Sequence, residues 1–257
     1  MLIGYHPHSE KLIQKLPEDG RKIILTRDPW NSPYWEEQNI SGLCWPMHAI
    51  PLSGVSGFRI SALSYRVRRS AILSIPKSHL DRKRDFHLKS DAVLQTRYPL
   101  YAFQVRGLRP DLEVELLDLE TENDPEKAFI GHHQVPEHGH HLHLHPGEMV
   151  PVSALGFYGW ATKEQDEEAH LMVRNFHYPE SIWCNNLERG LARRWEEYRV
   201  GVHVRQENNL LQVWMAGADQ DDHLVRVSAS FISQAGVEDH MNVLFSKQIE
   251  FIRNHLP

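Results

Sequence analysis

The stretch VGVHVRQENNLLQVWMAGADQDDHLVRVSASFI, residues 200–232, decides the fold class that we expect for this chain of 257 residues. Three of its segments are rich in β-branched and other apolar residues, which favour strands, and they lie at 200–205, 210–215 and 224–232. The connecting segments, QENN and AGADQDD, are short and polar, as hairpins between antiparallel strands require. The stretch therefore predicts a three-stranded antiparallel meander.

Strand-like patterns also occur in the rest of the chain. They consist of short apolar runs, or of apolar residues alternating with polar ones, flanked by turn residues. In the segment 98–106, for example, Tyr101, Phe103 and Val105 alternate with other residues. The predicted strands lie at 22–26, 58–67, 71–75, 98–106, 112–119, 150–158 and 170–176.

Helical spacing of apolar residues occurs at 9–16, at 186–199 and from about residue 240 onward. We find no regular alternation of strands with helices, which a parallel α/β sheet would require. The expected fold is mainly β within the α+β class: an antiparallel β-sandwich or jelly-roll-like core with a few peripheral helices. We expect a single domain over residues 1–257, and the alternative is a boundary near residue 180, with 181–257 as an α+β layer.

The composition is that of an ordinary globular protein, with 41% hydrophobic and 24% charged residues. No apolar run reaches the roughly 18 residues that cross a bilayer, and the start, MLIGYHPHSEKL, lacks the regions of a secretory signal. We therefore expect a cytoplasmic protein without membrane contact. Cys44 and Cys184 are too few for a disulfide framework, so we favour buried thiols over a bridge between them.

The segment GHHQVPEHGHHLHLHPGE, residues 131–148, contains 7 of the 18 histidines. From His141 to His145 histidine alternates with leucine, and on a strand such alternation places the two residue types on opposite faces. The leucines would face a core. His141, His143 and His145 would share the other face.

This face predicts a transition-metal site, because imidazole is a common ligand for zinc, iron and copper. Glu148 or His170 would supply a further ligand. Zinc is the first choice, since zinc with an open position activates water; iron, which suits oxygen chemistry, is the alternative. The competing interpretation is a solvated hairpin, or an interface, whose imidazoles share no ion.

Residues 143–156, HLHPGEMVPVSALG, resemble the first metal motif of cupins, in which two histidines one residue apart precede a glutamate ligand and a glycine. His143, His145 and Gly156 fit this spacing, but Met149 stands where the glutamate belongs. If the motif starts at His141 instead of His143, Glu148 supplies the glutamate ligand. Gly156 then comes one residue later than the motif requires. The resemblance implies a metal site, and it covers only this short segment.

The same residues resemble the signature of deubiquitinase-like metalloproteases through His143, His145 and Ser153. Gly156 takes the place of the metal-binding aspartate. The resemblance implies a metal site that lacks one ligand, which puts protease activity in doubt.

Charge is distributed unevenly along the chain, whose net charge is -6. The segment 66–89 has a balance of +6, and such asymmetry indicates an acidic partner. We predict that this surface binds nucleic acid or an acidic protein, with a solvated loop as the alternative. The basic residues are Arg66, Arg68, Arg69, Lys77, Arg82, Lys83, Arg84 and Lys89.

The sequence contains no glycine-rich phosphate loop and no serine-hydrolase elbow. We therefore expect a β-rich protein that binds a transition metal, with or without metal-dependent catalysis. The alternative function is a non-catalytic subunit of a larger assembly that uses the basic surface.

Overall fold

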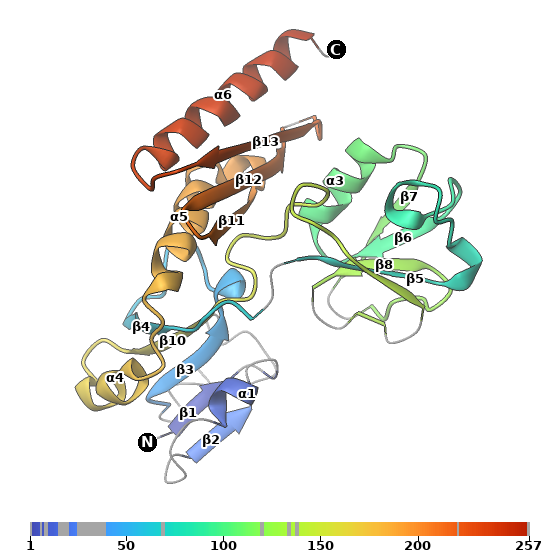
Figure 1. Ribbon diagram of the computed structural model, residues 1–257. Coiled ribbons are helices and arrows are strands. Elements are labelled where there is room, and N and C mark those ends of the chain that lie inside the picture. Colours follow the sequence, from blue (N-terminus) through green and yellow to red (C-terminus); the bar gives the residue numbers. More distant parts are fainter. Residues whose placement is uncertain are drawn as a thin grey trace. The chain divides into compact units, whose positions relative to one another are not determined.

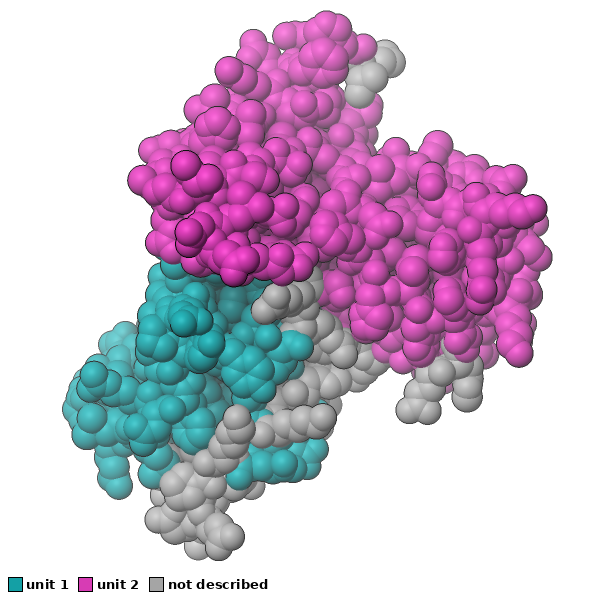
Figure 2. Space-filling view, viewed as in Figure 1, with its two compact units in different colours: residues 1–69, 154–189 teal, residues 70–153, 190–257 magenta. Residues whose placement is uncertain are grey.

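The computed structural model describes residues 2–5, 7, 10–14, 21–24, 40–67, 70–118, 121–132, 135–136, 139–219 and 221–255. Figure 1 shows their helices and strands, and Figure 2 shows the two compact units that they form. Unit 1 comprises residues 1–69 and 154–189, and unit 2 comprises residues 70–153 and 190–257. Neither unit is therefore a single continuous segment.

Unit 1 is built on a five-stranded sheet in the order β2-β1-β3-β10-β4. Its strands are β1 (Leu2–Tyr5), β2 (Arg21–Ile24), β3 (Gly42–Pro46), β4 (Phe58–Leu63) and β10 (Tyr158–Lys163). β1 runs parallel to β2 and β3, whereas β10 runs antiparallel to β3 and β4. The helices are α1 (Glu10–Ile13), α4 (Glu167–Arg174) and most of α5 (Glu180–Arg194).

Unit 2 contains a second five-stranded sheet, in the order β7-β6-β8-β5-β9. Its strands are β5 (Ile72–Ile75), β6 (Val93–Thr96), β7 (Glu113–Leu116), β8 (Ala128–Gly131) and β9 (His140–His143). β6 runs parallel to β7 and β8, whereas β5 runs antiparallel to β8 and β9. The helix α3 (Pro99–Leu108) buries Leu100, Tyr101 and Val105 in the same core as this sheet.

The remaining elements of unit 2 confirm the predicted meander. β11 (Gly201–Glu207), β12 (Leu210–Ala218) and β13 (Leu224–Phe231) pair antiparallel in sequence order. The helix α6 (Val237–His255) lies beside β13 and buries Met241, Phe245 and Ile249 (Figure 1). None of the described helices combines the length and the apolar character needed to cross a membrane.

The structure is mixed α and β with open sheets, and it corrects the expected antiparallel sandwich or jelly-roll-like core. Both five-stranded sheets contain parallel pairs. The reason is visible between β6 and β7, which are joined by α3, because a helical crossover is what allows two successive strands to run parallel. The segment of α3 was predicted to be a strand, so a helical crossover was not expected there.

The segment 98–106 was predicted as a strand because the middle of α3 is buried on all sides. Residues 100–105 are all buried, so no exposed polar residue marks the helical period. Gln104 imitates an outward-facing strand residue, yet its amide group donates to the Val150 carbonyl oxygen and accepts from the Val150 N–H, both at 2.8 Å.

The segment 170–176, also predicted as a strand, lies largely in α4. Asp166 is its N-cap, and its carboxylate accepts a hydrogen bond from the Ala169 N–H at 2.9 Å. Glu167 and Glu168 lie in the first turn, where negative charge stabilises a helix. These helix-start residues lie between the predicted strands 150–158 and 170–176.

Candidate functional site

Unit 1 contains a cavity of about 370 Å³ between β4, β10, α5 and the loop that follows β3. Its wall is mostly apolar and includes Met47, Ile50, Val55, Phe58, Leu63 and Ile182. Gly159 of β10 allows the loop to approach the sheet, because a Cβ atom there would collide with the Met47 sulfur. The cavity is therefore formed by segments that are far apart in the chain.

Arg189 is the positive charge in the cavity wall. Its guanidinium donates to the carbonyl oxygens of Met47 at 2.7 Å, Ile50 at 3.0 Å and Pro51 at 2.6 Å. Burial lowers the pKa of Arg189, because the charged form is poorly solvated there. No carboxylate of the described residues pairs with it, and the three backbone carbonyl oxygens occupy three of its five N–H groups, which leaves two for a ligand.

Asn185 and His177 are further polar groups in the wall. Asn185 is 4% exposed, and its Oδ1 has no hydrogen-bond partner among the described residues. His177 Nδ1 accepts from the Leu63 N–H at 3.2 Å, so the neutral ring carries its proton on Nε2. These residues were not among the predicted site residues. The only signal was Asn186 and Arg189 in the helix predicted at 186–199, directly after Asn185.

β9 has the two faces that the histidine alternation predicts. Leu142 and Leu144 pack with the unit 2 core, whereas His141 and His143 are exposed. Alternation of this kind identifies a strand with one buried face.

The ring nitrogens and the carboxylate of this segment have local partners. His141 Nε2 donates to the Pro136 carbonyl oxygen at 2.7 Å, and His145 Nδ1 accepts from the Gly147 N–H at 3.0 Å. The Glu148 carboxylate accepts from the His145 N–H at 2.8 Å, which closes the turn after β9. Within the described residues, no three of the predicted ligands have donor atoms within 4.8 Å of one another.

The fifth predicted ligand, His170, lies on α4 in unit 1, whereas the other four belong to unit 2. It does not lie on a strand beside β9, because residues 170–174 are helical. Elsewhere in the histidine segment, His132 is buried, with Nδ1 3.2 Å from the Tyr101 hydroxyl. His133 and His138 lie outside the described residues. The metal site at this segment remains a prediction.

One group of the described residues does bring three metal-binding side chains within 4.8 Å: Asp219, Asp221 and His223. They form the loop between β12 and β13. The Asp219 carboxylate accepts from the N–H groups of Asp221 at 3.0 Å and His223 at 2.8 Å, and it lies 3.2 Å from His223 Nδ1. Burial alone would raise the pKa of Asp219, but these hydrogen bonds outweigh it and lower the pKa.

Arg66 does not lie on the predicted basic surface. It forms an ion pair with Glu188, and the two side chains are 8% and 0% exposed. Its guanidinium lies 4.0 Å from the centre of the Phe157 ring. The Glu188 carboxylate also accepts from the Ala154 N–H at 2.7 Å. Burial and pairing therefore exclude Arg66 from the surface, which the sequence could not indicate.

The other described residues of the predicted basic surface are exposed and belong to unit 2: Lys77, Arg82, Lys83, Arg84 and Lys89. Arg68 and Arg69 lie outside the described residues, as do Trp30 and Trp35, which share the chain's aromatic-rich segment.

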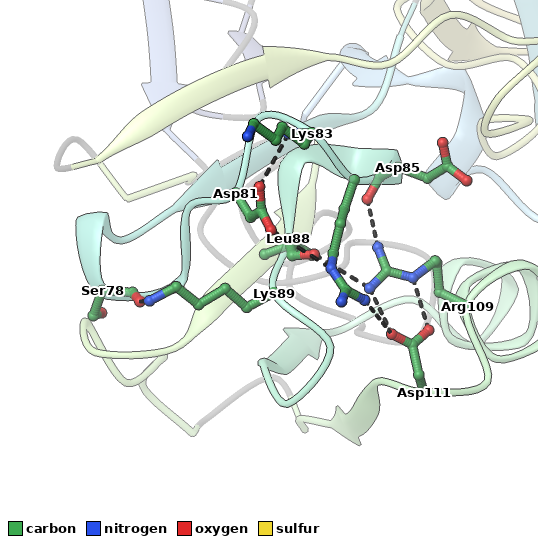
Figure 3. A network of polar contacts seen from close by, with 9 residues as sticks. Ser78, Asp81, Lys83, Asp85, Leu88, Lys89, Arg109 and Asp111 are labelled. Atoms are coloured by element: carbon green, nitrogen blue, oxygen red, sulfur yellow. Dashed lines mark hydrogen bonds and ion pairs between the residues drawn. The ribbon is translucent and has the colours of Figure 1, made fainter.

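Arg109 holds the loop that carries these charges (Figure 3). Its guanidinium donates to the carbonyl oxygens of Asp85 at 2.5 Å and Leu88 at 3.2 Å, and it pairs with Asp111 at 2.7 Å. The side-chain hydrogen bonds of this pair raise the pKa of Arg109 and lower that of Asp111. Arg109, which lies outside the basic segment, therefore stabilises the conformation of this loop.

No family model matches the sequence. Porphobilinogen deaminase of Chloroherpeton thalassium (strain ATCC 35110 / GB-78) is 28% identical to the chain over 176 residues. These residues cover 62% of this chain and 54% of that protein. The chain therefore spans about half the length of this curated relative.

Among solved structures, YhfZ from Shigella flexneri is 8% identical, with a TM-score of 0.34, and the match covers 74% of this chain and 95% of that one. A zinc-bound ligand-binding component of an ABC-type import system from Staphylococcus aureus is 12% identical, with a TM-score of 0.39, over 74% of this chain and 73% of that one. Both TM-scores are below 0.5, so neither likeness assigns the chain to a fold family.

Proposed function

We propose that this chain is a small-molecule-binding protein whose ligand occupies the unit 1 cavity. Ligand pockets have volumes of about 300–1,000 Å³ and apolar walls with a few polar groups, and this cavity, of about 370 Å³, fits that description. The observation that carries the proposal is the Asn185 Oδ1 atom, buried in the wall without a partner among the described residues. A hydrogen-bond donor of the ligand would satisfy it.

The proposed ligand is a small ring compound with an N–H or O–H donor for Asn185 and a carboxylate for Arg189. The name of the partial relative suggests porphobilinogen, a pyrrole that carries carboxylate side chains, as the first compound to test. No carboxylate, thiol or hydroxyl group of the described residues lines the cavity, so we propose binding without covalent chemistry.

The test is calorimetric titration of the whole chain with porphobilinogen and with indole, a neutral ring compound with an N–H donor. Val55→Trp should abolish binding because it fills the cavity from its own wall. The matched control is Ser56→Trp, an exposed neighbour that does not line the cavity and should bind as the natural chain does. Equal binding by Val55→Trp, or no binding of either compound, would contradict the proposal.

We also propose that the histidine-rich segment binds a transition-metal ion, with zinc as the first candidate and iron as the second. The supporting observation is that His141 and His143 share the exposed face of β9. Metal analysis by mass spectrometry of untagged protein, prepared without nickel or chelator, should find about one ion per chain. Replacing His141, His143 and His145 with alanine should remove the ion held at this segment, and an unchanged metal content would contradict the proposal.

A third proposal is that the exposed basic residues of unit 2 bind nucleic acid or an acidic protein. Their exposure supports it, and the loss of Arg66 from the surface weakens it. Binding should fall steeply with salt concentration. It should also be lost when Arg82, Lys83 and Arg84 are replaced with glutamate, and binding that survives this change would rule the surface out.

A further inference from the structure

We infer that His87 and His140 together form a transition-metal site in unit 2. His87 ends the short helical turn Asp85–His87, and His140 is the first residue of β9. Their ring centroids lie 5.7 Å apart, with an angle of 25° between the rings. The site joins the basic loop to the histidine-rich segment and does not use the exposed histidines of β9.

Each of the two rings has a buried nitrogen without a hydrogen-bond partner among the described residues. These atoms are His87 Nδ1 and His140 Nε2. A buried polar atom without a partner is unfavourable, and native proteins contain few of them. Here two occur on neighbouring rings from segments distant in the chain. One ion bound between the rings would satisfy both nitrogens.

The separation of the rings suits a shared ion. A zinc–nitrogen bond is about 2.0–2.1 Å long, and the ring centre lies about 1.1 Å farther along the same line, so each centroid would be about 3.2 Å from the ion. Two such rings at an angle between tetrahedral and trigonal would be about 5.2–5.5 Å apart. The observed 5.7 Å is close to this value, but the rings are stacked at 25°, so they would have to turn about their side-chain bonds to bring both nitrogens onto one ion.

The loop that presents His87 is held in an uncommon conformation. Phe86 and His87 have φ values of 57° and 53°, in the left-handed region. The His87 carbonyl oxygen accepts from the Asp81 N–H at 2.8 Å, and the Asp85 carbonyl oxygen accepts from Arg109. The surrounding hydrogen bonds therefore hold His87 in place without any metal.

Two imidazole ligands define the chemistry of the site. Imidazole suits zinc and copper, and with only two protein ligands the remaining positions would be taken by water or by a small ligand. The inference shares with the proposed function only the class of ligand, a transition-metal ion. The two sites use different residues. A test can therefore separate the two.

The experiment is calorimetric titration of the metal-free, untagged chain with zinc. His87→Ala combined with His140→Ala should weaken zinc binding by about tenfold or more, equivalent to about 1.4 kcal/mol. In the control, in which His141, His143 and His145 are all replaced with alanine, an ion on the exposed face of β9 would be lost, but the binding step that depends on His87 and His140 should keep its affinity within about twofold.

The opposite pattern, in which only the triple replacement loses zinc, would overturn the inference and leave the metal proposal intact. A natural chain that binds no zinc would defeat both proposals, and a double alanine variant that binds as many zinc ions as the natural chain, with the same affinity, would overturn the inference. If the double alanine variant does not fold, His87→Cys with His140→Cys decides the matter. Thiolates also bind zinc, so this variant should retain binding, and its failure to do so would overturn the inference.

Discussion

At the scale of the residue, Arg66 and Glu188 of unit 1 form an ion pair whose side chains are almost fully buried. Removing one partner of a buried pair leaves an uncompensated charge, so Glu188→Ala should lower the free energy of unfolding by about 3–5 kcal/mol. The loss of the hydrogen bond to the Ala154 N–H adds to the effect, because Ala154 has a φ of 62° that its neighbours must maintain. Urea unfolding measures the change.

The matched control is the exposed ion pair between Arg59 and Glu167, whose side chains are 35% and 69% exposed. Glu167→Ala should change the free energy of unfolding by less than about 1 kcal/mol, because solvent screens such pairs. Equal losses in the two variants would show that burial of the pair does not set its contribution.

At the scale of the element, the hairpin of β12 and β13 depends on the Asp219 carboxylate. A carboxyl with a pKa below its usual value of about 3.9 stabilises the fold above that pH, and the contribution is lost as the pH falls through the folded-state pKa. Asp219→Asn should therefore lower the free energy of unfolding by about 1–3 kcal/mol at pH 7. It should also reduce the stability lost between about pH 5 and pH 3.

Urea unfolding at the two pH values checks this prediction. The exposed neighbour Asp221 is the control, because its side chain accepts no hydrogen bond from the described residues. Asp221→Asn should therefore leave the pH dependence unchanged. If Asp219→Asn matched the natural chain at both pH values, the carboxylate would have no part in holding the hairpin.

At the scale of the whole molecule, the contribution of α5 to stability can be tested by shortening the chain at two different positions. A chain shortened at the predicted boundary, residue 180, loses Glu188 and Arg189, which hold Ala154 and the loop after β3. A chain ending at residue 189 keeps both and lacks the same meander. Circular dichroism should therefore show a higher melting temperature for the longer chain, and equal melting temperatures would contradict this role of α5.

Local patterns were sufficient where one face of an element is buried and the other is not. β13, the helix α6 and the alternation of His141 to Leu144 have this property and were predicted correctly. β11 and β12 are buried on both faces over most of their length, and they were predicted from their apolar runs and short polar connectors instead. α3 has no such contrast, because residues 100–105 are buried on every side. α4 has helix-start residues at Asp166, Glu167 and Glu168, but most of the helix was predicted as the strand 170–176.

The sequence by itself determined the β-rich C-terminal meander, the two faces of the histidine strand and the concentration of basic residues, because each depends on neighbours in the chain. Only the tertiary structure decided that the sheets contain parallel pairs, that Arg66 is buried against Glu188, and that Asn185 and Arg189 meet Met47 and Phe58 around a cavity. His87 and His140 meet in the same way, although 53 positions separate them. These contacts join distant segments, and no local period or motif specifies which distant residues will pack together.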